Sequence, residues 1–290
     1  MLKTRILTAL ALLAVFVPAG IWLPDAGWAI LAAVVVALAA WEWAGLMGYE
    51  KKGRVIYGAG MLALMLFLYA DHVFLRRSLD RAGIAAYAFA PIVFGMRALL
   101  WIPYLFWIVG VPLCLRFRWK ISGLTGLLLG VVILLPFWCA FVVVSEMPYI
   151  GGRVQLLTIL LIAWVADISA YFAGRAWGRH KLAPGISPGK TWEGVIGAVI
   201  GVMLYKGILL LYWSHSPFRG GQLLSMVIGA VLATAACILG DLFESLIKRQ
   251  AGVKDSSGLL PGHGGILDRI DSWLPLLVLY PVMTVFGYGH

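Results

Sequence analysis

Residues 121–144, ISGLTGLLLGVVILLPFWCAFVVV, decide the fold of this chain. The stretch has no charged side chain, and it exceeds the roughly 20 apolar residues that a helix needs to cross a bilayer. The whole chain has the same character: 62% of its 290 residues are hydrophobic, 12% are charged, and the mean hydropathy is +0.94. A soluble domain is about half apolar and about a quarter charged. We therefore predict an integral membrane protein and exclude a water-soluble globule.

Similar apolar segments predict an all-α, polytopic fold with about nine transmembrane helices. The first segment follows two basic residues, as in a signal peptide, but no clean small-residue cleavage site comes after it, so we interpret it as an uncleaved helix. Residues 82–95 leave two alternatives open, a crossing or an interfacial or re-entrant piece. The predicted spans are 5–23, 26–47, 55–70, 97–115, 121–144, 154–174, 193–213, 222–240 and 272–288.

The basic residues are distributed unevenly along the chain, which carries 23 Lys and Arg against 13 Asp and Glu, a net charge of +10. They gather in alternate connections, and such a bias marks the cytoplasmic loops of a membrane protein. It predicts a cytoplasmic N-terminus and explains the positive charge without a nucleic-acid partner. It also places both long polar loops, 175–192 and 241–271, in the cytoplasm.

The loop 241–271 combines acids, bases and glycines. Asp268 and Asp271 are three residues apart, so on a helix they would share one face. Carboxylates without cysteine favour a hard cation such as Mg²⁺ over zinc. The basic side chains can bind phosphate oxygens, and Gly264-Gly265 lets a backbone approach a ligand closely. This combination is typical of metal-assisted phosphoryl chemistry.

A second polar stretch begins at Asp167, inside an apolar span. A carboxylate there is expensive to bury, so we expect it to face a cavity, a partner or an ion. The sequence Gly189-Lys190-Thr191 resembles the end of a P-loop, but proline stands at 184 where that motif needs glycine, and no strand is predicted before it. We therefore exclude a P-loop. Instead we expect Ser187, Lys190 and Thr191 to open the next helix, whose free amide groups favour a phosphate.

Two acidic features keep alternative interpretations. Glu42, between Trp41 and Trp43, is either a cavity carboxylate or one that snorkels to the interface. Asp241 and Glu244 form an acidic pair that suits a metal as well as it suits helix capping or ion pairing.

Together these residues resemble a known family. The run from Ser245 to Asp271 resembles the signature of phosphatidate cytidylyltransferases, also called CDP-diacylglycerol synthases, and Asp167–Gly194 is similar to a second block of that family. The resemblance implies transfer from CTP to phosphatidic acid, with Mg²⁺ and room for a second cation, at the cytoplasmic face of a bacterial inner membrane. It implies a protein that is often a homodimer. Residues 1–150 are then the lipid-facing helices, and 151–290 the catalytic part.

The resemblance also implies roles for individual residues. We expect the catalytic residues to be Asp255, Asp268, Asp271 and Lys254, and the metal ligands to be Asp255, Asp268 and Asp271, with Asp241 and Asp167 as further candidates. The candidates for the phosphates of CTP or phosphatidate are Ser187, Lys190, Thr191, Lys248, Arg249, His263, Gly264, Gly265, Arg269 and Arg175.

Other classes of protein predict other patterns. A transporter favours inverted repeats and helices broken at mid-membrane, whereas here no repeat is visible and the polar residues gather in two loops on one side. A CTP-dependent polyprenol- or archaeol-phosphate transferase would share the nucleotide site and differ in its lipid groove.

Overall fold

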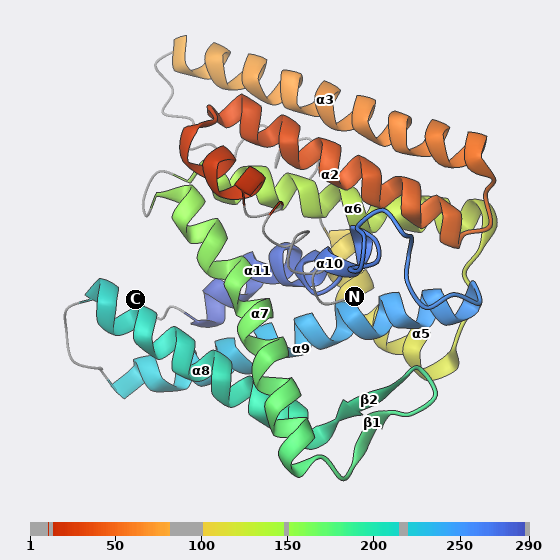
Figure 1. Ribbon diagram of the computed structural model, residues 1–290. Coiled ribbons are helices and arrows are strands. Elements are labelled where there is room, and N and C mark those ends of the chain that lie inside the picture. The colour runs from red at the N-terminus through yellow and green to blue at the C-terminus, as the bar shows by residue number, and fades with distance from the viewer. Residues whose placement is uncertain (1–10, 12–13, 82–100, 148–150, 215–219, 288–290) are drawn as a thin grey trace.

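The computed structural model describes residues 11, 14–81, 101–147, 151–214 and 220–287 (Figure 1). Most of these residues are helical, as predicted. The helices are α2 (Asp25–Leu46), α3 (Lys51–Arg81), the π-helix η1 (Phe106–Gly110), α5 (Val111–Phe117), α6 (Gly123–Ser145), α7 (Gly152–Trp177), α8 (Trp192–Ser214), α9 (Gly220–Gln250), α10 (Leu267–Ile270) and α11 (Trp273–Gly287); the strands are β1 (Lys181–Ala183) and β2 (Ser187–Thr191).

Six of the described helices are long and apolar enough to cross a membrane, namely α2, α3, α6, α7, α8 and α9. The span predicted at 97–115 corresponds to a shorter apolar helix, Trp101–Phe117, and that at 272–288 to the 15-residue α11. The segment 5–23 lies partly, and residues 82–95 wholly, outside the described residues. The count of about nine spans and the cytoplasmic N-terminus stay predictions.

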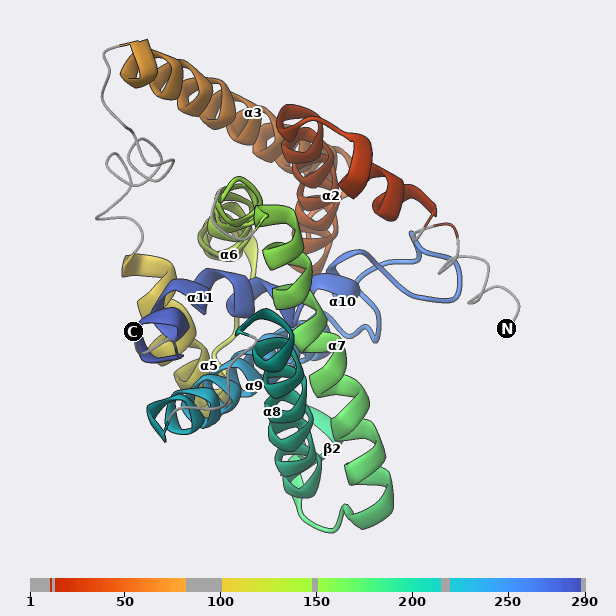
Figure 2. The ribbon, with the colours of Figure 1, turned by 90° about the vertical axis from the view of Figure 1, so that its left-hand side faces the viewer.

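Helices α2, α3 and α6 form one side of the molecule, and α2 and α3 lie side by side in both ribbon views (Figures 1 and 2). The guanidinium of Arg54 in α3 lies 3.5 Å from the ring centroid of Trp41 in α2, and its Nε donates to the Trp41 carbonyl. Gly58 permits the close approach of the two helices, because a Cβ there would lie 3.0 Å from the carbonyl oxygen of Ala37.

Helices α7 and α8 run together on the other side, and the hairpin of β1 and β2 joins them at one end (Figure 2). Their contact is built from small residues: a Cβ at Gly197 would clash with Ala173, and one at Gly201 with Ser169. Small residues of this kind let membrane helices approach closely. The connection between α7 and α8 is thereby held in one place.

The described chain is all-α, as predicted, apart from this short hairpin, which corrects one local prediction. Strands β1 and β2 pair antiparallel, with Lys181 opposite Thr191 and Ala183 opposite Ser187. Ser187, Lys190 and Thr191 therefore lie on a strand, and our expectation that they open the next helix is wrong. Helix α8 begins only at Trp192.

The second correction concerns residues 241–250, which we predicted as loop. They are the last turns of α9, which continues to Gln250. The helix persists because Leu242, Phe243, Leu246 and Ile247 are buried and give this polar stretch an apolar face.

An aromatic cluster joins segments that lie far apart in the sequence. Phe243 of α9 packs against Trp43 of α2, with ring centroids 6.2 Å apart, and against Phe106 and Trp107 of η1 at 5.5 and 6.0 Å. Trp43 also donates from Nε1 to the carbonyl of Gly126 in α6, at 2.8 Å. The cluster thus fixes α2 against α9 and α6.

Charged groups hold α2, α3, α6 and α7 together at the end away from the hairpin. Glu146, just after α6, accepts from Nε2 of His72 at 3.1 Å and from Arg76 at 3.0 Å, both in α3. Arg153, near the start of α7, forms an ion pair of 2.8 Å with Asp25, the first residue of α2. These contacts connect α2, α3, α6 and α7 at the end away from the hairpin.

Candidate active site

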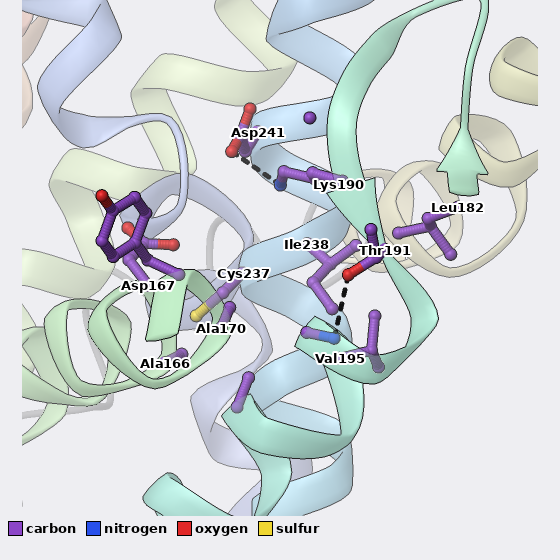
Figure 3. Close-up of a pocket in the computed structure, with 14 residues that line it drawn as sticks. Ala166, Asp167, Ala170, Leu182, Lys190, Thr191, Val195, Cys237, Ile238 and Asp241 are labelled. Atoms are coloured by element: carbon purple, nitrogen blue, oxygen red, sulfur yellow. Dashed lines mark hydrogen bonds and ion pairs between the residues drawn. The ribbon is translucent and has the colours of Figure 1, made fainter. Parts of the chain in front are cut away.

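A pocket of about 220 Å³ opens where α7, the hairpin, α8 and α9 meet (Figure 3). Its wall combines apolar side chains with a few charged or polar ones. The lining residues are Ala166, Asp167, Ala170, Tyr171, Leu182, Gly189, Lys190, Thr191, Gly194, Val195, Ala198, Cys237, Ile238 and Asp241. Most ligand pockets have this composition, in which a few polar groups fix the orientation of the ligand.

An ion pair between the two polar stretches lines this pocket. The Nζ of Lys190, on β2, is 2.6 Å from Oδ2 of Asp241, on α9 (Figure 3). Ser245, one turn further along α9, donates to the other oxygen of Asp241 at 3.2 Å. Neither partner is buried, since 23% of the Lys190 side chain and 28% of the Asp241 side chain are exposed. The pair is therefore oriented by the protein and accessible to a ligand.

Asp271 belongs to the same group of charges. A Cβ at Gly240 would clash with the carbonyl of Asp271, so this glycine allows the segment after α10 to pass close to α9. Burial raises the pKa of Asp271, and the carboxylates of Asp241 and Asp167 act in the same direction, while Lys190 opposes them. Asp271 is therefore coupled electrostatically to Asp241, Asp167 and Lys190.

Thr191 has a structural task in this site. Its hydroxyl accepts from the backbone N–H of Gly194 at 3.1 Å, which caps the N-terminus of α8. One of the free amide groups that we expected to attract phosphate is thus already paired.

Asp268, in contrast to Asp271, is held inside the protein. One oxygen accepts from Lys248 at 2.6 Å; the other accepts from the backbone N–H groups of Ser256 and Gly265, at 2.9 and 2.7 Å. Burial acts against ionisation, but these donors prevail and lower the pKa of Asp268. The two carboxylates that the spacing placed on one helix face therefore have different partners.

Lys248 lies between two carboxylates, about two turns of α9 beyond Asp241. Its Nζ is 2.6 Å from Oε2 of Glu244 and 2.6 Å from Oδ1 of Asp268. Only 13% of the lysine side chain is exposed, with 3% of Glu244 and 5% of Asp268. The structure thus uses this predicted phosphate ligand for an internal ion triad of Glu244, Lys248 and Asp268.

The glycine pair is close to a carboxylate of the protein. Gly264 has φ +83°, a conformation that favours glycine, and a Cβ there would lie 2.6 Å from Oδ2 of Asp268. The next residue, Gly265, is buried. Its N–H donates to the same Asp268 oxygen.

The remaining predicted residues lie at the surface or border the loop 251–266. His263 is half-buried, and its Nδ1 is a buried atom with no hydrogen-bond partner among the described residues. Arg175 donates to the hydroxyl of Tyr171 at 2.9 Å, which places it beside the pocket. The exposed predicted residues are Arg175, Arg249, Lys254, Asp255 and Arg269; Ser187 is half-buried on β2.

The donor set around Lys190 fits a magnesium ion. Mg²⁺ prefers carboxylate oxygens and usually takes one or two of them, the rest of its shell being water and substrate phosphate. Asp167 and Asp241 line the pocket, and Asp271 interacts electrostatically with both. Over the described part of the chain, no three His, Cys, Asp or Glu side chains are already placed to hold a metal ion. A magnesium ion held by Asp167 and Asp241 would complete its shell with water and substrate phosphate.

Sequence reasoning missed two contributors to these arrangements and the partner of a third. Tyr171 lines the pocket, but a tyrosine in a membrane protein is expected in the aromatic belt. Ser256 contacts Asp268, but no pattern marks a serine next to another serine in a loop. Glu244 was noted for its spacing from Asp241, and the i,i+4 spacing to Lys248 is the signal that could have identified its partner.

Comparisons with known proteins agree over the whole chain. A model described as the Cytidylyltransferase family matches residues 3–286. The chain is 40% identical to the phosphatidate cytidylyltransferase of Pseudomonas aeruginosa over 300 residues, which covers 100% of this chain and 99% of that protein. It is 33% identical to the phosphatidate cytidylyltransferase of Haemophilus influenzae, with 99% of each chain covered. The protein of that name from Brucella abortus is 40% identical over 136 residues, 47% of either chain.

Proposed function

The chain belongs to the cytidylyltransferase family, and we propose that it transfers the cytidylyl group of CTP to phosphatidic acid, forming CDP-diacylglycerol and pyrophosphate. The full-length similarity to two phosphatidate cytidylyltransferases supports the identity of both substrates. The structural observation that carries the proposal is the pocket lined by Asp167, Lys190 and Asp241, in which Lys190 and Asp241 form an ion pair.

The main obstacle to this reaction is repulsion between anions. A phosphomonoester has a second pKa near 6, so phosphatidate is largely dianionic at neutral pH and must approach the α-phosphorus of a polyanion. One of its oxygens bonds to that phosphorus, while the bond to the β-phosphate oxygen breaks and pyrophosphate leaves. Groups that neutralise this charge therefore dominate catalysis. Lys190 and the exposed Arg175, Arg249, Lys254 and Arg269 supply positive charge around the pocket and the loop 251–266.

We propose Asp167 and Asp241, which line the pocket, as the residues that hold Mg²⁺, with Asp271 as a further candidate. The ion, when bound, would neutralise phosphate oxygens and the developing charge on pyrophosphate. Asp255 is exposed, so it is free to bind a second cation from the loop side. Asp268 serves a different purpose in this proposal, because its oxygens hold Lys248 and the loop amides.

The same charge pattern supports a location in the bacterial cytoplasmic membrane. The pocket opens beside the hairpin and the end of α9, both within loops that the basic residues assign to the cytoplasmic side. CTP would enter from the cytoplasm, and phosphatidic acid would arrive laterally from the bilayer.

The reaction can be tested with purified protein in detergent micelles, phosphatidic acid, labelled CTP and Mg²⁺. We expect label in the lipid phase with one pyrophosphate released per lipid labelled, loss of both when EDTA removes the metal, and recovery when Mg²⁺ is restored. Transfer to a polyprenol or archaeol phosphate but not to phosphatidic acid would replace the lipid substrate. No transfer to any lipid phosphate, with folded protein, would overturn the proposal.

His263→Gln is expected to retain measurable activity. The attacking phosphate is already deprotonated at neutral pH, so no general base is needed. We assign the imidazole of His263, whose Nδ1 has no hydrogen-bond partner among the described residues, to a hydrogen bond with a phosphate. Steady-state kinetics against pH will check this: the variant should keep the wild-type pH profile with a modestly raised KM. Complete inactivation together with loss of the acidic limb of the profile would identify His263 as a base.

A further inference from the structure

Glu42 is buried in α2, far in sequence from both polar stretches, and we propose that it is a positioning residue that holds the loop 251–266 in its reactive shape. The effect of Glu42 on catalysis rests on the proposed function. That one carboxylate of the N-terminal helices fixes a loop of the C-terminal part can be tested separately.

The carboxylate of Glu42 has donors on both oxygens. Oε1 accepts from the N–H of Ile266 at 2.9 Å and from the hydroxyl of Ser257 at 2.6 Å. Oε2 accepts from the N–H of Leu267 at 2.7 Å and lies 3.1 Å from the hydroxyl of Ser256. The Glu42 side chain has no exposed surface. It therefore faces neither a cavity nor the membrane interface, and both interpretations of the sequence are wrong.

These donors come from two places in the chain that the loop brings together. Ser256 and Ser257 lie within the loop, Ile266 is its last residue and Leu267 is the first residue of α10, so Glu42 ties the middle of the loop to its end. Gly265 lies between them: a Cβ there would be 2.6 and 2.7 Å from the two oxygens of Glu42. The glycine that we predicted for contact with a substrate is thus required for contact with a carboxylate of the protein itself.

A second carboxylate works with Glu42. The hydroxyl of Ser256 lies 3.0 Å from Oδ2 of Asp268 as well as 3.1 Å from Glu42. A hydroxyl has one proton to donate, so this serine shares it between two acceptors or alternates between them. Asp268 is in turn held by Lys248 of α9. The loop is therefore fastened to α2 by one carboxylate and to α9 by the other.

The residues next to these attachment points are those predicted to act on substrates. Lys254 and Asp255 directly precede Ser256, and His263 and Gly264 directly precede Gly265. A shift of either attachment point moves these side chains relative to the pocket, and a misplacement of about 1 Å can lower a rate about 10²-fold. Glu42 itself is rigidly placed, because its neighbour Trp43 packs on Phe243 of α9. Positioning is thus the role that this geometry supports.

The test compares Glu42→Gln with Glu146→Gln. Glutamine keeps the shape of Glu42 but turns one acceptor oxygen into an NH₂ group facing donors, so at least one pair of hydrogen bonds is lost. Glu146 is a matched control, since it is also buried and also accepts two hydrogen bonds, but at the opposite end of the helices. For both variants we would measure kcat and KM for CTP, thermal unfolding, and hydrogen–deuterium exchange of the peptide covering 256–267.

For Glu42→Gln we expect kcat to fall about 10²-fold and the amides of Ile266 and Leu267 to exchange faster, with little change in KM. For Glu146→Gln we expect a similar loss of thermal stability, wild-type kcat and unchanged exchange at these amides. Wild-type kcat in Glu42→Gln would overturn the proposal, as would unchanged loop exchange in that variant.

Two further outcomes keep the result unambiguous. If Glu42→Gln does not fold, the test uses Ser257→Ala, which removes one hydrogen bond to Oε1 of Glu42 and leaves the carboxylate with its other donors. Faster exchange at Ile266 together with a smaller loss of kcat supports the proposal. No change in exchange or in kcat overturns it. If the wild-type protein makes no CDP-diacylglycerol, the proposed function fails. Exchange in Glu42→Gln then decides on its own whether Glu42 holds the loop.

Discussion

Replacement of Asp241 by asparagine is expected to lower kcat for cytidylyl transfer by about 10²–10³-fold, the usual effect of removing one group that stabilises charge in a transition state. Asn keeps the shape of the side chain and removes the charge that faces Lys190 at 2.6 Å. The fold should survive, because both partners are partly exposed and water can solvate the released lysine. Initial rates at several Mg²⁺ concentrations will measure the effect.

The control for Asp241→Asn is Asp25→Asn. Asp25 also forms an ion pair with a basic residue, Arg153, but at the opposite end of the helices. We expect it to leave kcat unchanged. If Asp241→Asn keeps more than about a tenth of the wild-type kcat at saturating Mg²⁺, a loss smaller than a single stabilising group provides, then Asp241 takes no part in the reaction.

Lys248→Met is expected to destabilise the protein by about 3–5 kcal/mol, because removing one partner leaves uncompensated buried charge. Glu244 and Asp268 would then face each other with only 3% and 5% of their side chains exposed. Reversible unfolding in mixed micelles, followed by circular dichroism, will give the change in the free energy of unfolding. If Lys248 instead binds a substrate phosphate, its removal raises KM and leaves the unfolding free energy nearly unchanged.

A double variant sharpens the Lys248 experiment. Adding Glu244→Gln to Lys248→Met removes one of the two uncompensated charges, so part of the lost stability should return. The lone variant Arg249→Met is the matched control, since Arg249 is the next residue and is exposed. No recovery in the double variant would mean that packing of the lysine stem, and not its charge, accounts for the loss.

Apolar runs predicted most of the membrane helices closely. The span expected at 26–47 is α2 (Asp25–Leu46), and that at 193–213 is α8 (Trp192–Ser214). Such segments can be predicted from sequence because the thickness and apolar interior of the bilayer fix their length and hydropathy. The end of α9 was not readable. Its last turns carry many charged side chains, and they remain helical because their apolar face is buried and because Lys190 and Asp268 supply partners from other parts of the chain.

The hairpin could not be predicted from the sequence for a related reason. Strand β2 has the sequence Ser-Pro-Gly-Lys-Thr, and proline and glycine are depleted in strands. It is stabilised by pairing with β1 and by the ion pair of Lys190 with Asp241 beside the pocket. The sequence did predict that Lys190 and the residues of 241–271 lie on the same side of the membrane. Tertiary packing decides which basic side chain pairs with which carboxylate. Only the structure could therefore show that Glu42 and Asp268 hold the same loop.

The attachments of α2 have a mechanical consequence. This helix is fixed at its beginning by the ion pair of Asp25 with Arg153 and at its end by the four donors to Glu42. Within its most apolar stretch 61% of the residues are buried, against 17% in α8. Helix α2 is therefore held at both ends and along much of its length, whereas α8 packs against α7 and leaves most of its surface outside the protein. The loop that Glu42 holds thereby shares the fixed position of α2, so a substrate that enters from the bilayer would meet this loop already in place.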